Sequence, residues 1–535
     1  MGYYTRWVKR IDILKLDVMS IKRVFNSRIL LVILFSLAYF ASRLPSLGSD
    51  EINPDGVNWH YRSEQFIVGL KTGQLEKTYQ HYHPGVTLMW IMGSAVEILK
   101  QISPGGLIYT HYHFLAFHTV AKYALVVVQL VLSAISIYLL SSVWVKDGIK
   151  GFYRALLVVS LFSFEPFFTG NSRLLHLDVL FTMLLFNGLI LAYLSTQKFG
   201  WIKGSMAGIF LGLAFLTKSI GIGGITFALL IGGFFVYRNN RGTQTAKALF
   251  RYILCLFASF IATVFIFFPA LWVDPLNVII DIFSEGERIG IRNGHGQIIL
   301  GEYTRNAGPL FYPLVLLLKM SPVIWIGLIT FLVSIKSEFK GLVKNRGLMM
   351  FLALFYLGYF LVMTYPSKKI DRYMIPVFPL AALFAVTGFE RIKGRFKHIL
   401  VLSASAYLVF ANMKYHPYQF TYTSPIFGSP ESANRLIAEK PFGIGIPLLK
   451  TFILENYGYY PDIGFIDTKP MRSIYMNSRI FDIRVNGTSD YDLLILGVNE
   501  ELPEKVINSK VKFIKDSSIY INGLEYWRIY VKEGR

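Results

Sequence analysis

An acidic stretch near the start of the chain carries the residue types that proton transfer requires. Asp50 and Glu51 are adjacent, Asp55 follows shortly after them, and Trp59 and Arg62 come next at helical spacing. An aspartate fixed at the start of a helix is well placed to act as a general base toward a substrate. The sequence Asn-Pro-Asp-Gly is also typical of turns, so Asp55 is alternatively a turn or N-cap residue in a solvated loop.

The stretch 78–90, TYQHYHPGVTLMW, places Tyr82 and His83 directly before a proline that begins an amphipathic segment. These side chains could bind a substrate, or they could anchor the chain at a membrane interface, where Tyr and Trp are enriched. Three more histidines follow before residue 119, but their spacing matches no closed zinc site. We therefore expect no metal and no other cofactor, with a divalent ion as an open alternative.

The stretch 172–181, SRLLHLDVLF, brings Arg173, His176 and Asp178 to the beginning of an apolar run. A charge at the centre of a bilayer costs at least about 2.5–3.5 kcal/mol, so an acid that enters a span indicates function. That cost falls near the interface, where a structural ion pair between Arg173 and Asp178 is the alternative. Asp178 is a second candidate catalytic acid, and Arg173 and His176 are candidate substrate-binding residues.

Isolated cations at the ends of apolar runs suit the binding of a phosphate. Lys218 lies between two apolar runs and beside glycines, where a point charge and exposed backbone N–H groups can hold an anion. A lysine in that position can also extend to the membrane interface. Lys368, Lys369 and Arg372, followed by Tyr373, form a basic cluster in YPSKKIDRY. On the outer side of a membrane, such a cluster predicts an anionic lipid headgroup or a phosphate as ligand.

The elements that must position these side chains are membrane spans. The chain has 535 residues, of which 53% are hydrophobic and only 16% are charged, against about 25% charged in soluble domains. Its formal net charge of +21 does not indicate nucleic acid, because Lys and Arg collect in the cytoplasmic loops of membrane proteins. The apolar runs cover residues 28–45, 119–145, 153–169, 175–196, 204–217, 220–237, 250–272, 310–335, 348–365, 373–389 and 396–413.

The distribution of basic residues predicts the orientation of the spans. Seven Lys and Arg residues precede or begin the first run, which places the N-terminus in the cytoplasm. With eleven crossings, or thirteen if a pair is missed, the basic short loops all fall on that side. The first loop (46–118), the loop 273–309 and the candidate chemistry fall outside. The amphipathic segment 84–100 lies in the interface or forms a further span. We expect a multi-pass protein of the cytoplasmic membrane.

The tail of the chain differs in kind from the rest. Residues 492–498 are typical of a buried strand, and residues 510–533 alternate like a hairpin with Asn522-Gly523 as its turn. We predict a membrane domain over residues 1–413 and a small extracytoplasmic α/β domain over residues 414–535.

Two acids and three basic sites on one membrane face suit the attack of an acceptor on a phosphate-linked group. With these motifs, the chain resembles the polyprenyl-phosphate-sugar-dependent glycosyltransferases of the GT-C superfamily, which include protein O-mannosyltransferases and the lipid A aminoarabinose transferase. The resemblance rests on Asp55 with the aromatic and the arginine behind it, and on HPGVTLMW, SRLLHLD, FLTKSIG and KKIDRY in that order. It extends to about residue 413.

The resemblance implies an α-helical fold of about 11–13 spans and transfer of a sugar, with inversion, from a polyprenyl-phosphate carrier without a metal. It makes Asp55 the catalytic loop acid and Asp178 the second acid. Asp50, in the Asp-Glu pair that the family usually shows, stays a rival. Lys218 and the 368–372 cluster then face the donor phosphate. The acceptor, whether protein, lipid or glycan, is left open.

Two other classes of protein remain as alternatives. A lipid or glycan transporter or flippase would place ionisable groups near the bilayer midplane, often within inverted repeats. The chain has no evident repeat, and its apolar runs hold few charges. An envelope-assembly protein without catalysis would tolerate the loss of Asp55, whereas the enzyme would not.

Overall fold

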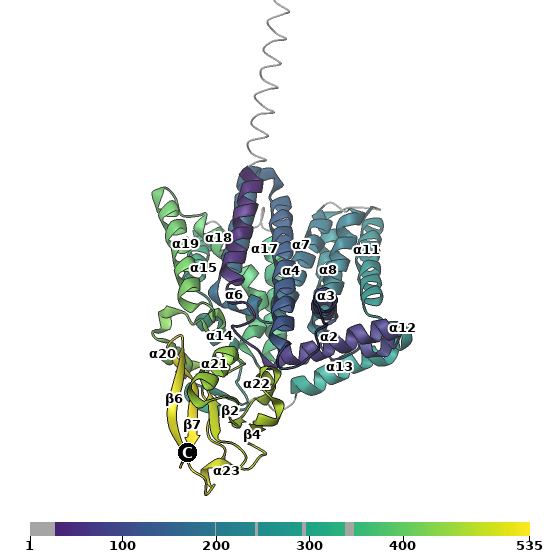
Figure 1. Cartoon of the computed structure of the whole chain (residues 1–535). Helices are drawn as coiled ribbons and strands as arrows, with labels where there is room; N and C mark the ends of the chain where they lie inside the picture. The colour runs from purple at the N-terminus through teal and green to yellow at the C-terminus, as the bar shows by residue number, and fades with distance from the viewer. Residues whose placement is uncertain (1–26, 198–199, 241–243, 292–295, 338–346, 535) are drawn as a thin grey trace, which may run out of the picture.

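The computed structural model describes residues 27–197, 200–240, 244–291, 296–337 and 347–534. Most of these residues are helical, and long helices run side by side with a sheet from the C-terminal part at one end of the bundle (Figure 1). The fold is that of an α-helical polytopic membrane protein with a small C-terminal α/β part, as the sequence predicts.

Among the described residues, seven helical segments are long and apolar enough to cross a membrane, or nine if each of two bent pairs forms one span. The seven are α4 (Phe114–Val143), α7 (Asp178–Gln197), the stretch Ser219–Asn239, α11 (Gln244–Phe267), α17 (Gly347–Thr364), the stretch Asp371–Phe389 and α19 (Arg395–Tyr415). Helix α8 (Trp201–Thr217) and the helical residues 27–43 are shorter than this criterion. All eleven apolar runs are thus helical, but fewer than eleven are single uninterrupted spans.

Two of the seven segments change helix type along their length. The first consists of η3 (Ser219–Gly221), α9 (Ile222–Phe227), the π-helical η4 (Ala228–Gly232) and α10 (Gly233–Asn239). The second consists of η5 (Asp371–Val377) and α18 (Phe378–Phe389). Pro376 lies inside η5, and the missing N–H of a proline prevents a regular α-helical turn at that point.

The two bent pairs meet at their breaks. Helices α5 (Ile149–Ser163) and α6 (Pro166–Arg173) are bent by 69°, and α14 (Phe311–Lys319) and α15 (Pro322–Ser337) by 112°. Glu165 lies in the first break and Ser321 in the second. The carboxylate of Glu165 accepts a hydrogen bond from the backbone N–H of Ser321, with 3.0 Å between N and Oε2, and another from the hydroxyl of Ser321. Each break therefore satisfies polar groups of the other, which a buried backbone requires.

Helices between the spans lie across the bundle rather than along it. Figure 1 shows α2 (Pro54–Thr72) and α13 (Pro275–Ile291) running crosswise at the end that carries the C-terminal sheet, with α12 (Ala270–Val273) beside them. Leu276 and Ile280 of α13 are exposed, as expected for an amphipathic helix at a membrane interface. The remaining elements of this region are η1 (Leu75–Thr78), α3 (Val86–Ile102) and the hairpin β1 (Gln297–Ile299) with β2 (Glu302–Thr304), whereas η2 (Val145–Asp147) connects α4 to α5.

The tail forms a five-stranded sheet with the order β4-β3-β5-β7-β6. The buried strand is confirmed as β5 (Leu493–Gly497), and the hairpin as β6 (Phe513–Ile521) and β7 (Leu524–Lys532). Asn522 and Gly523 connect them with φ angles of +50° and +89°, the conformation that a two-residue hairpin turn requires. The other elements are η6 (Gln419–Thr421), η7 (Pro425–Phe427), α20 (Pro430–Leu436), α21 (Ile446–Tyr457), β3 (Ile463–Phe465), α22 (Thr468–Ile474), η8 (Asn477–Arg479), β4 (Ile480–Asp482) and α23 (Glu504–Ile507).

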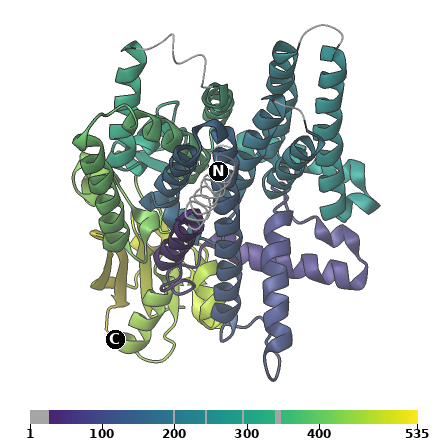
Figure 2. The same cartoon turned by 90° about the horizontal axis from the view of Figure 1, so that it is seen from above.

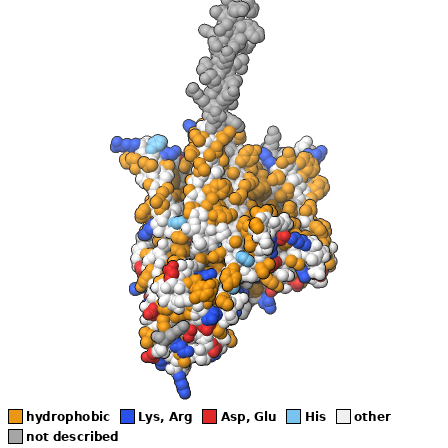
Figure 3. Space-filling view, in the orientation of Figure 1, with side chains coloured by type: hydrophobic (Ala, Val, Ile, Leu, Met, Phe, Trp, Pro, Cys, Tyr) orange, Lys and Arg blue, Asp and Glu red, His pale blue; other side chains and the backbone are white. Residues whose placement is uncertain are grey.

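The surface divides along the same line. In the face that Figure 3 shows, hydrophobic side chains cover most of the helical part, and charged side chains are more frequent on the C-terminal part. Figure 2 shows the same bundle of helices from above. Helix α7 is buried almost along its whole length, so it forms the centre of the membrane part.

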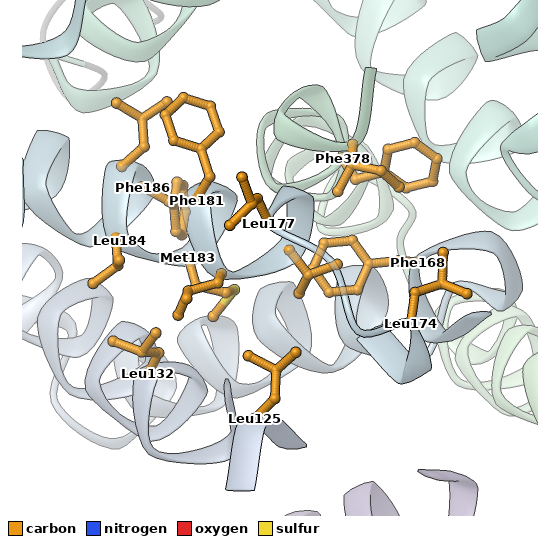
Figure 4. Close-up of a cluster of buried hydrophobic side chains, with 14 of the residues drawn as sticks. Leu125, Leu132, Phe168, Leu174, Leu177, Phe181, Met183, Leu184, Phe186 and Phe378 are labelled. Carbon is orange, nitrogen blue, oxygen red and sulfur yellow. The ribbon is translucent and has the colours of Figure 1, made fainter. Parts of the chain in front are cut away.

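A cluster of apolar side chains holds the link between α6 and α7 in place. Figure 4 shows Leu174 and Leu177 of this link among side chains from α4, α6, α7 and α18, including Leu125, Phe168 and Phe378. All five are nearly inaccessible to solvent. Close packing with neighbours on four helices therefore fixes the position of the link and of the residues that it carries.

Candidate active site

Four side chains from three segments that are distant in sequence meet at the end of the bundle that faces the C-terminal sheet. The imidazole of His176 lies between two carboxylates, with Nε2 3.1 Å from Asp55 Oδ2 and Nδ1 2.7 Å from Asp178 Oδ2. The guanidinium of Arg372 also contacts both carboxylates, with 2.8 Å between Nη2 and Asp55 Oδ2 and 3.2 Å between Nε and Asp178 Oδ2. The sequence prediction that these residues belong together agrees with this geometry.

The two carboxylates have different surroundings. The side chain of Asp55 is 40% exposed, whereas that of Asp178 is 4% exposed. Asp178 Oδ1 accepts a hydrogen bond from the amine of Lys218, which also lies 4.5 Å above the ring of Tyr373. Asp178 Oδ2 forms ion-pair contacts with His176 and Arg372, but neither contact has the geometry of a hydrogen bond. Asp178 is therefore enclosed by cations, and Asp55 is the acid that a substrate can reach.

Local sequence explains the position of Asp55. Asn53 is the N-cap of α2, and its side chain accepts a hydrogen bond of 2.6 Å from the N–H of Gly56. Pro54 fits the first helical position, where no N–H is needed. Asp55 thus lies in the first turn of α2, where the helix dipole favours a negative charge. It is not the N-cap or turn residue of the alternative interpretation.

The pKa of Asp55 follows from its neighbours. Burial acts to raise the pKa, but the hydrogen bond with His176 and the charges of Arg372 and His176 outweigh it, so that the pKa lies well below the ordinary value. The nearby Asp178 opposes this shift only weakly. The carboxylate of Asp55 is therefore ionised at neutral pH.

One turn further along α2, an aromatic residue and an arginine stack. The guanidinium of Arg62 lies 4.6 Å from the centre of the Trp59 ring. The same ring packs on Gly85, where a Cβ atom would lie 2.2 Å from it, and the φ angle of Gly85 is +62°. A glycine is required here because neither the φ angle nor the contact with Trp59 admits a side chain.

Neutral and cationic groups surround the exposed side of Asp55. Burial lowers the pKa of His81 to about 4, with a contribution from Arg62 and a smaller one from Lys368. Burial, together with the charge of Lys218, lowers the pKa of His83 well below its ordinary value. Both imidazoles are therefore neutral at pH 7, and the positive charge near Asp55 comes from lysine and arginine side chains.

Tyr82 and Lys368 complete the candidate site. Burial raises the pKa of Tyr82 to about 12, with a smaller contribution from the charge of Asp55. Burial lowers the pKa of Lys368, with Asp55 acting against it and Arg372 and Lys218 acting with it. Lys368 forms no ion pair within the described ranges of the chain, so its amine is available to an anionic ligand.

The rival acid Asp50 lies in a separate, closed network. Asp50 contacts Lys122 at 2.6 Å and Arg173 at 2.8 Å, and Glu51 contacts Lys122 at 2.9 Å. All four side chains are at most 2% exposed. The pair between Arg173 and Asp178 that the sequence suggested as an alternative is therefore wrong, because Arg173 pairs with Asp50.

Lys369 points away from the other cations. Its amine donates hydrogen bonds of 2.7 and 2.6 Å to the carbonyl oxygens of Thr364 and Pro366. These hydrogen bonds tie the Lys369 amine to the backbone just before it in sequence. The structure therefore brings Lys368 and Arg372 to Asp55, but not Lys369.

Sequence reasoning missed the contribution of the tail. The ring of Phe442 lies over the guanidinium of Arg372 at 4.4 Å and beside the imidazole of His176, with ring centres 6.4 Å apart. The only sequence signal is its setting in PFGIG, where two glycines indicate close backbone approach. No group of three or more His, Cys, Asp and Glu side chains in the described residues could hold a metal ion.

Comparison with known protein families gives no match, and no curated protein matches the sequence. Among solved structures, ArnT from Cupriavidus metallidurans bound to undecaprenyl phosphate is similar over 93% of this chain and 97% of that chain, with a TM-score of 0.52 and 12% sequence identity. The chain has the GT-C fold.

Two further solved structures are similar at lower TM-scores. The oligosaccharyltransferase of Archaeoglobus fulgidus is similar over 88% of this chain and 69% of that chain, with a TM-score of 0.45 and 11% identity. The S. cerevisiae protein O-mannosyltransferase Pmt1-Pmt2 complex bound to the sugar donor is similar over 45% and 33%, with a TM-score of 0.35 and 18% identity. At these scores, the assignment of the GT-C fold rests on ArnT alone.

Removing the cation of the closed network should unfold the protein more easily. We expect Lys122→Met to cost about 3–5 kcal/mol, because it leaves two buried carboxylates short of a partner. The measurement is the melting temperature of the purified protein in detergent. Lys146→Met, at an exposed position near the end of α4, should leave the melting temperature unchanged. Equal melting temperatures for the two variants would contradict the assignment of this network as structural.

The glycine under Trp59 gives a second prediction. Gly85→Ala should move the Trp59 ring and with it Arg62, because the new Cβ atom has no room. We expect the tryptophan fluorescence to change and the melting temperature to fall. Gly105→Ala, whose new Cβ atom meets no atom within 4 Å, should lower the melting temperature less. Identical behaviour of the two variants would mean that the contact with Trp59 is not required.

Proposed function

We propose that the chain is an integral-membrane glycosyltransferase that moves a sugar from a polyprenyl-phosphate carrier to an acceptor hydroxyl or amine. The observation that carries this proposal is the partly exposed carboxylate of Asp55, held between His176 and Arg372 beside cations that have no carboxylate partner. The fold similarity to ArnT, whose structure holds undecaprenyl phosphate, supports a carrier of this kind. The orientation of the spans, with this site on the extracytoplasmic face, remains the prediction of the loop charges.

The reaction forms one bond and breaks one bond at the anomeric carbon of the sugar. The acceptor oxygen or nitrogen attacks from the side of Asp55 and loses its proton to that carboxylate. The bond between the anomeric carbon and the phosphate oxygen breaks, and its electrons leave with the polyprenyl phosphate. Attack and departure on opposite faces invert the anomeric centre.

The low pKa of Asp55 fixes the timing of proton transfer. An ionised carboxylate is ready to accept a proton, but one with a low pKa is a weak base. The acceptor group becomes acidic only as it bonds to the anomeric carbon, so the proton moves late in the step. His176 and Arg372 hold the carboxylate in position while this happens.

The cations near Asp55 supply the stabilisation of the leaving group. Negative charge develops on the phosphate as its bond to the sugar breaks, and fixed cations are most effective where charge develops. Lys368 and Arg62 are the cations next to Asp55 that form no ion pair in the parts of the chain that the structure describes. Lys218 and Arg372 form ion pairs with carboxylates, so they act on the leaving phosphate only through their electrostatic field.

Substitution of the proposed base tests the function directly. With a panel of radiolabelled polyprenyl-phosphate sugars in proteoliposomes, we expect wild type to transfer sugar from one carrier. Asp55→Asn should lower the initial rate at least about 100-fold, the usual contribution of a general base. Glu302→Gln, an exposed acid on the β1–β2 hairpin, should retain full activity.

Each other outcome points to a different class of protein. Transfer by wild type and by Asp55→Asn at equal rates would contradict the role of Asp55. Absence of transfer from every carrier would favour the transporter or the envelope-assembly protein. A carrier lipid that moves between leaflets without loss of its sugar would identify the transporter.

The site should work without a metal ion. Three basic side chains already occupy the carboxylate oxygens of Asp55 and Asp178, so a divalent ion would have to displace them. We expect excess EDTA to leave the initial rate unchanged in the same proteoliposomes. A complete loss of transfer that Mg²⁺ or Mn²⁺ restores would refute this expectation.

A further inference from the structure

A short segment of the tail, Pro441–Gly445, crosses directly over the acid loop of the membrane part. The N–H of Ile52 donates a hydrogen bond of 3.0 Å to the carbonyl oxygen of Gly443, and the N–H of Gly445 donates one of 2.9 Å to that of Asp50. Between them, Ile444 and Glu51 pair as an isolated antiparallel bridge. We call Pro441–Gly445 the strap.

The opposite side of the strap is attached to the C-terminal sheet. The indole N–H of Trp527 in β7 donates a hydrogen bond of 3.0 Å to the carbonyl oxygen of Ile444. The hydroxyl of Tyr526 donates a hydrogen bond of 3.2 Å to the carbonyl oxygen of Pro441. The strap therefore joins the sheet rigidly to the loop that leads into Asp55.

The backbone of the strap is held in an unusual conformation. Phe442 has a φ angle of +41°, which L-residues with a large side chain rarely adopt and which costs free energy. Gly443 follows with a φ of +71°, and a Cβ atom there would lie 1.9 Å from the carbonyl oxygen of Ile52. This conformation directs the ring of Phe442 toward the candidate active site.

The ring of Phe442 is one member of a stack between two cations. It lies 4.4 Å from the Arg372 guanidinium, and it also stacks on Phe420 of η6, with ring centres 5.5 Å apart and 24° between the planes. Phe420 packs on Phe167 of α6 at 5.9 Å, and the amine of Lys319 lies 5.0 Å from the Phe167 ring.

The far end of the stack returns to the tail. Lys319 of α14 forms an ion pair with Glu439, two residues before the strap, and both side chains are about 95% inaccessible. The stack of Arg372, Phe442, Phe420, Phe167 and Lys319 thus has a fixed partner at each end. A guanidinium over an aromatic face gains a cation–π interaction that is strongest when water is excluded.

From this arrangement we propose that Phe442 is a positioning residue for the transfer reaction. Its ring fixes the plane of the Arg372 guanidinium, and Arg372 in turn holds the carboxylates of Asp55 and Asp178. The tail is then a part of the active site and not only a domain beside it. This inference rests on the proposed glycosyltransferase function and adds a residue to its site.

The decisive experiment changes the electronic character of the ring without changing its size. Phenylalanine with one, two or three ring fluorines at position 442 keeps nearly the same shape, while each fluorine weakens the negative face that attracts the guanidinium. We expect kcat for sugar transfer, measured at a temperature well below melting, to fall stepwise by about 2- to 30-fold in total. Equal kcat values for wild type and all three fluorinated proteins would overturn the proposal.

Natural substitutions give a second and independent series. Phe442→Tyr keeps the aromatic face and should transfer sugar within about twofold of wild type, whereas Phe442→Met fills the space without such a face and should lower kcat. Phe513→Met is the matched control, because Phe513 lies in the same tail, stacks on Tyr491 with ring centres 5.4 Å apart and packs against a separate apolar cluster. It should lower the melting temperature without lowering kcat at a temperature well below melting.

A measurement without catalysis separates this inference from the proposed function. A double-mutant cycle with Phe442→Met and Arg372→Gln reports their coupling through the melting temperature alone. A smaller effect of Phe442→Met in the Arg372→Gln background supports the stack, and strictly additive effects overturn it. If wild type transfers no sugar from any carrier, the proposed function fails and this cycle still decides whether Phe442 holds Arg372.

Discussion

The structure depends on holding two like charges close together at the end of a helix bundle. Asp55 and Asp178 would repel each other, and a buried carboxylate is costly to ionise. His176 and Arg372 each contact both acids, and Lys218 adds a further contact to Asp178. The same contacts that make the pair stable also fix the direction of the Asp55 carboxylate.

Each of these side chains is held in turn by packing elsewhere. The apolar cluster of Figure 4 fixes the link between α6 and α7 that carries His176 and Asp178. The closed network around Asp50 and Lys122 fixes the loop that leads into α2 and Asp55. The strap of the tail lies over both regions. Removal of any one support should therefore disturb the site without touching a reacting atom.

The sequence singles out most residues of the candidate site but not their partners. Asp55, His176, Asp178, Lys218 and Arg372 all stand out because a charge at the end of an apolar run needs a reason. Asp50 stands out equally, and only its 2% exposure separates it from Asp55, which is 40% exposed. Phe442 gives no such signal, since an aromatic residue in a globular tail is most often part of a core.

The sequence by itself determined the membrane class, the approximate limits of the apolar helices and the terminal hairpin. These features follow from hydropathy, alternation and turn chemistry, which act over short segments. The tertiary structure alone decided which acid is accessible, which cations are already paired and that the tail reaches the site. Those features depend on contacts such as Asp55 with His176 and Arg372, which are 121 and 317 residues apart in sequence, and the packing of the whole chain sets such contacts.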